Sequence, residues 1–227
     1  KGLALNFANH PDTLGGNEVS GDWPAVTREL VSRRYGVPVI LFNGACGDIN
    51  HINPFDGATR NPGIGARIAA ALDSGAAAVV ESSPAPSPAE SLRVAETTAR
   101  LPRRVVTRAE IEKAEKSMKE FPGTLRALVA KALLIQAGKK NPFVGNPMML
   151  VGLDRSFGLL CASGELFTEI GAAFKRLSPF ERTMVAENCD ATLGYIPTAK
   201  AFAARAKNLE IRPEEFAAIE LGEAIGI

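Results

Sequence analysis

The chain has 227 residues, 46% of them hydrophobic and 22% charged, which is enough apolar material for one globular domain over residues 1–227. Its 26 basic residues nearly balance its 25 acidic ones, so charge gives no support for a protein that binds nucleic acid. No stretch approaches the roughly 20 consecutive apolar residues of a transmembrane segment. Three widely spaced cysteines, Cys46, Cys161 and Cys189, predict no disulfide framework and leave the compartment open, a secreted or periplasmic location included.

The first predicted element is a strand that begins almost at the first residue. Leu3, Leu5 and Phe7 alternate with small or polar residues, a pattern typical of a half-buried strand. The chain lacks an initiating Met, and a strand needs neighbouring strands. We therefore expect a segment before Lys1 that was cleaved or is otherwise separate from this chain.

Helices and strands alternate over the next part of the chain. Residues 20–35 predict an amphipathic helix that ends at Gly36, and residues 37–42 predict a short buried strand that leads into a glycine-containing loop. An alanine-rich helix is expected over residues 64–79. The Pro- and Ser-rich stretch at 82–88 then predicts a surface connection.

A charged helical insertion follows the next predicted strand, which covers residues 92–101. Thr107, with Glu110 three residues later, forms a capping-box start for one helix. A second helix continues to Ala137, so the two make a helical hairpin or bent pair. We expect this insertion to span about 107–139 and assign it no chemistry.

The last part of the chain returns to strands. Residues 148–153 and 157–162 predict a β-hairpin that leads to Ser163-Gly164-Glu165, where we expect a helix to begin and to continue to Leu177. A further strand is expected over residues 183–186. The fold class is therefore α/β, a mixed sheet with flanking helices and no internal repeat.

Three separate residues have side chains suited to a functional site. His10 ends the first predicted strand, where its ring can face a cleft, although a lone histidine is also often a structural hydrogen-bonding residue. Glu165 lies at the predicted helix start, where the helix dipole favours a carboxylate, and such acids are common in first turns. Tyr195 is by position alone better interpreted as an ordinary half-buried turn aromatic.

The loop after the second predicted strand is the most distinctive stretch, and it reads Asn43-Gly44-Ala45-Cys46-Gly47-Asp48-Ile49-Asn50. Its small residues let a backbone approach a ligand closely, while Asp48 and Asn50 present polar groups. A nucleotide-binding loop is the alternative, although the stretch lacks both the P-loop and the dinucleotide glycine patterns. Cys46 is interpreted as a packing residue rather than a nucleophile.

Four motifs in this order resemble those of the neutral/alkaline (non-lysosomal) ceramidase family, including its smaller bacterial relatives. They are Asn9-His10-Pro11, Asn43 to Asp48, Gly164-Glu165-Leu166-Phe167 and Gly194-Tyr195-Ile196-Pro197-Thr198. The resemblance covers nearly the whole chain and includes Ser20-Gly21-Asp22 after the histidine. It implies a neutral-ceramidase catalytic-domain-like fold, of which this chain would be the later part.

The resemblance also implies a zinc-dependent hydrolase of an amide bond in an N-acyl, ceramide-like lipid, with metal-activated water as the nucleophile. Matching by motif places zinc ligands at His10, Glu165 and Tyr195. The remaining histidine ligand of the family lies upstream of every residue present here. An amino-terminal segment is therefore expected to complete the metal site.

The same resemblance gives the candidate groups that act on the substrate. Catalytic groups fall at Asp48 and Asn50, and substrate-binding groups at Asn43 and Gly44. His51, where relatives often carry proline, is an additional substrate-binding candidate, with a surface loop histidine as the alternative. Ceramide-cleaving members carry serine at the position of Asn50, and an amide side chain can donate a hydrogen bond but cannot act as a hydroxyl. Their tyrosine-rich stretch is also absent, because residues 201–211 contain no tyrosine.

Three hypotheses follow from these residues. The first is a zinc amidohydrolase that acts on an N-acyl lipid or a related amide. The second is a ceramidase-like domain that has lost or changed its catalysis and binds a ligand without hydrolysing it, because folds outlive functions. The third is a nucleotide-binding α/β domain, which would bind phosphate at the loop after Phe42 and no metal at His10.

Overall fold

The computed structural model describes residues 2–16, 18–51, 62–82, 91–103 and 105–201. Its helices and strands, in chain order, are β1 (Leu3–Phe7), α1 (Asp22–Tyr35), β2 (Val39–Asn43), α2 (Pro62–Ser82), β3 (Leu92–Pro102), α3 (Arg108–Glu120), α4 (Leu125–Ala137), β4 (Phe143–Leu153), β5 (Phe157–Ala162), β6 (Glu165–Leu166), α5 (Thr168–Leu177), β7 (Arg182–Ala186) and β8 (Tyr195–Ile196). The predicted surface connection at 82–88 lies, apart from Ser82, outside the described residues.

The amino-terminal elements form a β–α–β unit. Strands β1 and β2 are parallel, and α1 connects them. Gly36 ends α1 in the left-handed conformation, with φ 63°, and its amide donates to the Ser32 carbonyl, so the predicted stop is confirmed. Val31 and Val39 are buried between the helix and the strands.

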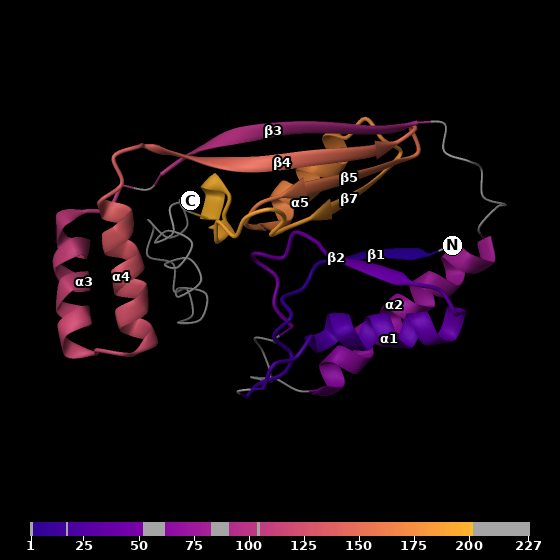
Figure 1. Ribbon diagram of the computed structural model, residues 1–227, viewed down its shortest axis with the longest axis horizontal. Coiled ribbons are helices and arrows are strands. Elements are labelled where there is room, and N and C mark those ends of the chain that lie inside the picture. Colours follow the sequence, from indigo (N-terminus) through magenta and orange to yellow (C-terminus); the bar gives the residue numbers. More distant parts are fainter. Residues whose placement is uncertain (1, 17, 52–61, 83–90, 104, 202–227) are drawn as a thin grey trace.

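Helix α2 lies beside α1 and against β1 (Figure 1). Contrary to the expectation from the sequence, the stretch Gly63–Ser82 of α2 is long and apolar enough to cross a membrane, and it is the one such helix in the described ranges. In the fold, however, Ile64, Ala69 and Ala76 are buried, because α2 packs against other elements along one side.

A four-stranded mixed sheet has the order β3-β4-β5-β7. The β3–β4 and β4–β5 pairs are antiparallel, and the β5–β7 pair is parallel. Strand β4 begins earlier than the predicted hairpin strand because its first half pairs with β3 alone. Strand β7 also contacts β1 and β2, which places the β–α–β unit beside this sheet (Figure 1). The mixed sheet with flanking helices is the predicted fold class.

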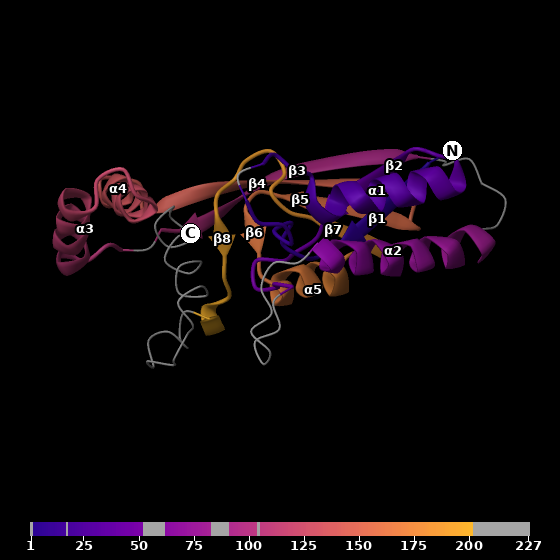
Figure 2. The ribbon, with the colours of Figure 1, turned by 90° about the horizontal axis from the view of Figure 1, so that it is seen from below.

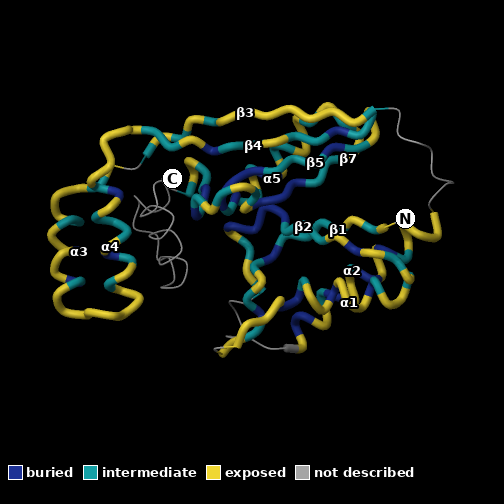
Figure 3. Tube along the Cα trace, viewed as in Figure 1, coloured by how far each residue is buried: buried dark blue, intermediate teal, exposed yellow. Residues whose placement is uncertain are grey.

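Helices α3 and α4 form the predicted helical insertion, and the hairpin projects from the end of β3 and β4 (Figure 1). The capping box of α3 is confirmed, because Glu110 and Thr107 exchange side-chain and backbone hydrogen bonds. Ala114 and Ala130 are buried, one on each of these packed helices. Much of the surface of α3 and α4 is exposed (Figure 3).

The segment after β5 differs from the prediction. Glu165 does not open a helix; it lies in the two-residue strand β6, which pairs in parallel with β8 (Figure 2). Helix α5 begins at Thr168. The prediction that a helix dipole acts on the Glu165 carboxylate is therefore wrong, because Glu165 precedes the helix and its backbone pairs with β8 as a strand.

The main core lies where these short strands meet the mixed sheet. Its buried members are Ala45, Ala162, Leu166, Val185 and Ile196. Ile170 and Phe174 of α5 cover it from one side. The core therefore joins the loop after β2 to β6, β7 and β8, and these are the segments that carry most of the predicted site residues.

A glycine pair under Phe180 gives a direct test of this packing. Gly152 and Gly158 are register partners in β4 and β5, and a Cβ added to either would overlap the Phe180 ring. We expect Gly158→Ala to lower the free energy of unfolding by about 1–3 kcal/mol, since overpacking forces ring and backbone apart. Urea unfolding would measure it.

The matched control is Gly75→Ala in α2, where an added Cβ meets nothing within 4 Å. This change should raise the free energy of unfolding by roughly 0.5–1 kcal/mol, because alanine loses less backbone entropy in a helix. Equal effects of the two alanine substitutions would contradict the packing of Phe180 on Gly158.

Candidate metal centre

Three segments that are distant in the sequence bring together His10, Glu165 and Tyr195. His10 follows the carboxyl end of β1, while Glu165 and Tyr195 are partners in the parallel β6–β8 ladder. The Glu165 amide donates to the Gly194 carbonyl at 2.7 Å. Backbone pairing thus sets two of the three side chains next to each other.

The three side chains face one another across a small space. Nδ1 of His10 lies 3.7 Å from Oε2 of Glu165, and the two side chains are 18% and 19% exposed. The rings of His10 and Tyr195 meet edge to face, with centroids 5.8 Å apart. The Glu165 carboxylate is close enough to act electrostatically on the Tyr195 hydroxyl. The trio is therefore half-buried and remains open to a small ligand.

The pKa of the Tyr195 hydroxyl lies well above its ordinary value. Burial is the largest cause, followed by the negative charge of Glu165 and the hydrogen bond to it. Asp12 adds to the same effect. The Tyr195 phenol therefore holds its proton more tightly than an ordinary tyrosine does.

The backbone of His10 is held by the start of α1. Nε1 of Trp23 donates to the His10 carbonyl at 3.2 Å, and the Trp23 side chain is fully buried. Asp22 fixes the loop between them, because its carboxylate accepts from Thr13 Oγ1 at 2.7 Å and from the Leu14 amide at 2.9 Å. The Ser20-Gly21-Asp22 stretch thus orients the loop that carries His10.

Replacement of Asp22 by asparagine tests this support. Burial alone raises the pKa of Asp22, but hydrogen bonds from Thr13 and from the backbone of Trp23 and Leu14 outweigh it, so the pKa is lowered. A lowered carboxyl pKa stabilises the fold above the unfolded value of about 3.9, and this stability is lost as the pH falls through the folded value.

We therefore expect Asp22→Asn to cost about 1–3 kcal/mol of unfolding free energy at pH 7, with the difference from wild type closing below about pH 4. Urea unfolding between pH 3 and 8 measures both. If the difference in unfolding free energy between wild type and Asp22→Asn did not change with pH, the charge of Asp22 would not contribute to stability.

The glycine-containing loop after β2 is anchored by a buried acid, Glu187. The Cys46 amide donates to Oε2 of Glu187 at 3.0 Å, and the Cys46 thiol donates to Oε1 at 2.9 Å. Burial is the main cause that raises the pKa of Glu187 to about 7, and the nearby charge of Glu165 adds to it. Glu187 thus holds the loop in place through its two hydrogen bonds with Cys46.

Cys46 lies beside the trio, with its Sγ atom 3.8 Å from Nδ1 of His10. Burial, followed by the charge of Glu187 and the hydrogen bond to it, raises the pKa of the Cys46 thiol far above its ordinary value. A thiol that stays protonated is a poor nucleophile. The interpretation of Cys46 as a packing residue therefore agrees with its surroundings.

The amides of this loop are already engaged within the protein. Those of Gly44, Gly47 and Ile49 donate to the carbonyls of Phe7, Leu166 and Cys46 at 2.8, 2.8 and 2.9 Å. A phosphate cradle needs backbone amides that point at the ligand. The geometry of the loop therefore disfavours the nucleotide-binding hypothesis.

The residues predicted to contact the substrate lie around this loop. Asn43 ends β2, and with its amide nitrogen turned toward β1 it donates to the carbonyls of Phe7 and Asn9 at 3.0 and 3.1 Å. Gly44 is buried, and a Cβ there would lie 3.2 Å from the Ala8 side chain. Both therefore shape the loop that faces His10.

The two predicted catalytic residues occupy the outer part of the loop. The Asp48 carboxylate accepts from the Thr168 amide at 2.6 Å and from Thr168 Oγ1 at 3.0 Å, so it caps the first turn of α5. Asn50 is exposed. The structure does not bring Asp48 or Asn50 into a described contact with His10, Glu165 or Tyr195.

The predicted substrate-binding histidine forms a second polar pair next to the trio. The His51 ring is 2% exposed, and its Nδ1 atom lies 3.0 Å from Oδ1 of Asp12. Within the described residues, Nε2 of His51 makes no hydrogen bond. The negative charge of Asp12 also contributes to the raised pKa of Tyr195, so the Asp12–His51 pair lies near Tyr195.

The donor set of the trio determines what it could hold. Histidine, cysteine and carboxylate side chains in the described ranges form no group of three that could bind a metal ion. The third donor of the predicted set is instead a phenol, so His10, Glu165 and Tyr195 offer one nitrogen and two oxygen donors. A zinc ion accepts nitrogen and oxygen ligands, with a histidine and a carboxylate among its commonest partners.

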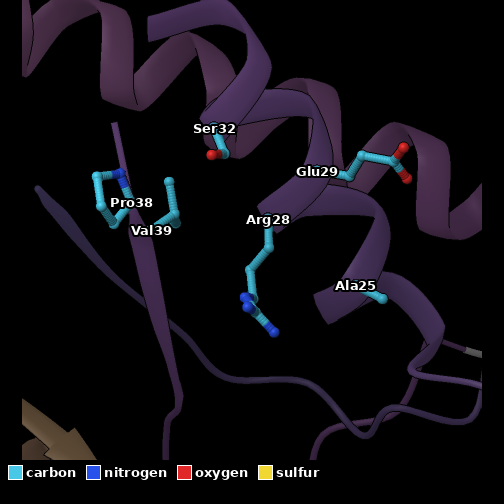
Figure 4. A pocket seen from close by; sticks show the side chains of 6 residues that line it. All are labelled: Ala25, Arg28, Glu29, Ser32, Pro38 and Val39. Atoms are coloured by element: carbon cyan, nitrogen blue, oxygen red, sulfur yellow. The ribbon is translucent and has the colours of Figure 1, made fainter. Parts of the chain in front are cut away.

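A groove elsewhere on the described surface is a different feature. It holds about 400 Å³ and lies between α1 and the start of β2 (Figure 4). Its lining consists of Ala25, Arg28, Glu29, Ser32, Pro38 and Val39. None of the predicted site residues lines it, so it is not part of the candidate metal centre.

Sequence reasoning missed Glu187 and Asp12. Glu187 directly follows the apolar strand β7, and a polar residue at the carboxyl end of a strand is the signal that could have found it. Asp12 lies two residues after His10, but its proximity to His51 depends on a contact across the loop that no local pattern indicates.

No protein-family description matches the sequence, and no curated protein matches it significantly. Among solved structures, that of a neutral ceramidase from Pseudomonas aeruginosa is similar, with a TM-score of 0.61 over 97% of this chain. The two sequences are 13% identical, and the match covers 41% of the ceramidase chain, so this chain spans less than half of its length. The similarity shows a shared fold and confirms the predicted fold class.

Proposed function

We propose that this chain carries the core of a zinc-dependent hydrolase that cleaves the amide bond of an N-acyl lipid, ceramide-like or related. The observation that supports this most strongly is the convergence of His10, Glu165 and Tyr195 from three separate segments. That convergence occurs in a fold similar to a neutral ceramidase, which is a hydrolase. Fold alone does not define function, so the proposal depends on these side chains.

The trio fits a catalytic zinc site in its chemistry. Such sites use three protein ligands and keep a position open for water or substrate. His10 and Glu165 are of the usual ligand types, and their facing atoms are 3.7 Å apart. When bound, zinc supplies a Lewis acid that activates water at neutral pH and polarises the amide carbonyl.

The protein's own groups set the geometry of this site. Asp22 and Trp23 hold the loop of His10, and the β6–β8 pairing holds Glu165 beside Tyr195. Such fixed supports reduce the reorganisation that a reaction needs. The amide of Asn50 is proposed to donate a hydrogen bond to the substrate carbonyl oxygen, and Asp48 to fix the loop that carries Asn50.

The substrate is proposed to lie on the side of Asn43, Gly44 and His51. An acyl amide is proposed to approach the loop backbone at these residues, because small residues permit a close approach. The buried ring of His51 offers a polar contact for a head group, with Asp12 fixing its orientation. A hydroxyl or amide of the substrate would satisfy the Nε2 atom of His51.

One observation favours a second candidate, a domain that binds such a lipid without cleaving it. Asp48 is engaged as the cap of α5, and Asn50 stands where ceramide-cleaving relatives carry serine. A protein of this kind would keep the ligand-binding residues and lack turnover. The two candidates therefore differ in chemistry at a shared site.

The test combines elemental analysis with turnover of an N-acyl sphingoid substrate that carries a fluorescent acyl chain. The proposal expects bound zinc and release of the free fatty acid, with release lost on chelation and restored by zinc. Zinc and substrate binding without release of fatty acid would support the second candidate. Absence of both zinc and lipid binding in the natural protein would overturn both.

A further inference from the structure

A second pair of side chains lies close to the candidate metal centre and belongs to neither ligand set. Cys161 is in β5, and Cys189 is in the segment between β7 and β8. The two are far apart in the sequence, which is why spacing predicted no disulfide. In the fold the Cys161 thiol is close enough to act electrostatically on the Cys189 thiol. All three cysteines of the chain are free thiols in this structure.

The backbone fixes this contact independently of the thiols. The Cys189 amide donates to the Ala162 carbonyl at 3.0 Å, directly next to Cys161. Oγ of the buried Ser163 donates to the Cys189 carbonyl at 2.8 Å, and the Asn188 amide donates to the Gly164 carbonyl at 3.1 Å. These bonds hold the two chain segments side by side, as the formation of a disulfide between them requires.

We propose that Cys161 and Cys189 form a disulfide bond that cross-links the segment leading to Glu165 with the segment leading to Tyr195. The bond would close the chain between β5 and the end of β7. Both residues are half-buried, whereas Cys46 is fully buried and its thiol is bound to Glu187. Access and geometry thus single out one pair among the three cysteines.

The chemistry needs an oxidant, and a small-molecule disulfide such as oxidised glutathione supplies it. One cysteine thiolate attacks a glutathione sulfur, so a mixed disulfide forms and one glutathione leaves. The second cysteine then attacks the mixed disulfide and expels the other glutathione. Two electrons pass from the cysteine sulfurs to oxidised glutathione, and the two thiol protons end on the two reduced glutathione molecules.

A cross-link at this position constrains the site more than it constrains the rest of the fold. Glu165 follows Cys161 by four residues and Tyr195 follows Cys189 by six, and these residues pair in the β6–β8 ladder. Closing a chain loop between two segments lowers the entropy of the unfolded state and holds the native pairing. The disulfide therefore stabilises the segment pair whether or not a metal is bound.

The test is peptide mapping of the natural protein after equilibration with oxidised glutathione and trapping of free thiols with N-ethylmaleimide. We expect a peptide pair joined through Cys161 and Cys189, lighter by two hydrogens than its reduced form, and an unlinked Cys46. The midpoint of thermal unfolding should rise by roughly 5–10 °C on oxidation. Cys161→Ser and Cys189→Ser should each remove that rise.

The contrary results are equally clear. Free Cys161 and Cys189 at equilibrium, a stable glutathione adduct on either one, or a bond from either one to Cys46 would overturn the inference. A midpoint that rises equally in the serine variants would show that oxidation acts elsewhere. Because these measurements use neither zinc nor substrate, their outcome is independent of the proposed hydrolase activity.

Discussion

Replacement of His10 by alanine is expected to remove zinc from the natural protein. Its Nδ1 atom lies 3.7 Å from Glu165, and it is the one nitrogen donor of the trio. Since groups that merely orient a ligand change metal affinity by about 10–100-fold, loss of a direct ligand should cost more than about 100-fold. Elemental analysis after gel filtration would give close to one zinc per chain in wild type and almost none in His10→Ala.

The loss of zinc should be accompanied by a loss of hydrolysis of about 10³-fold or more, because water is no longer activated. Glu165→Ala should behave in the same way. His51→Ala is the matched control for metal content, because the chain has only two histidines and His51 pairs with Asp12 rather than with Glu165. If His51→Ala lost as much zinc as His10→Ala, the metal would not be bound by His10, Glu165 and Tyr195 alone.

Local sequence patterns were sufficient to predict most of the longer helices and strands. Alternation over Leu3–Phe7, the Gly36 stop and the capping box at Thr107 each lie within a few residues of sequence, and the structure confirms all three. In each case the interaction that determines the element is made by neighbours along the chain. The strands and helices that do not depend on distant partners could therefore be predicted from the sequence.

The start of α5 could not be predicted in the same way. Phe167, at the N-cap position, has no side-chain cap, and the carboxylate of Asp48 supplies it from across the fold. The sequence around Glu165 therefore lacks the signal that marks the true start at Thr168. Likewise, β6 and β8 are only two residues long, and they form strands because they pair with each other. A two-residue segment is too short to show a strand periodicity in the sequence.

The candidate site shows the same division. Motif resemblance placed His10, Glu165 and Tyr195, and the structure brings these three together. The supporting groups were not predicted, because their roles come from packing: Glu187 reaches Cys46, and Asp12 reaches His51, across segments that are distant in sequence. The position of Glu187 after an apolar strand could have marked it as a candidate, but its partner Cys46 could not be read from the sequence.

Replacement of Glu187 by alanine is expected to destabilise the protein by about 2–4 kcal/mol, because it leaves a cavity and deprives the Cys46 amide of its acceptor. Urea unfolding at pH 7 measures the change. Glu181→Ala is the matched control, since Glu181 lies just before the same strand and is exposed. It should alter the unfolding free energy by less than about 0.5 kcal/mol.

The pH dependence separates the charge of Glu187 from its shape. Burial raises the pKa of this carboxyl to about 7, so between about pH 4.3 and 7 the folded protein holds a proton that the unfolded chain has released. Its stabilising contribution is complete below that window and is lost as the pH rises through 7. In metal-free protein, the stability of wild type relative to Glu187→Gln should therefore fall from pH 5 to pH 8. A constant difference would mean that Glu187 is ionised throughout, and that it anchors the Cys46 loop as a carboxylate.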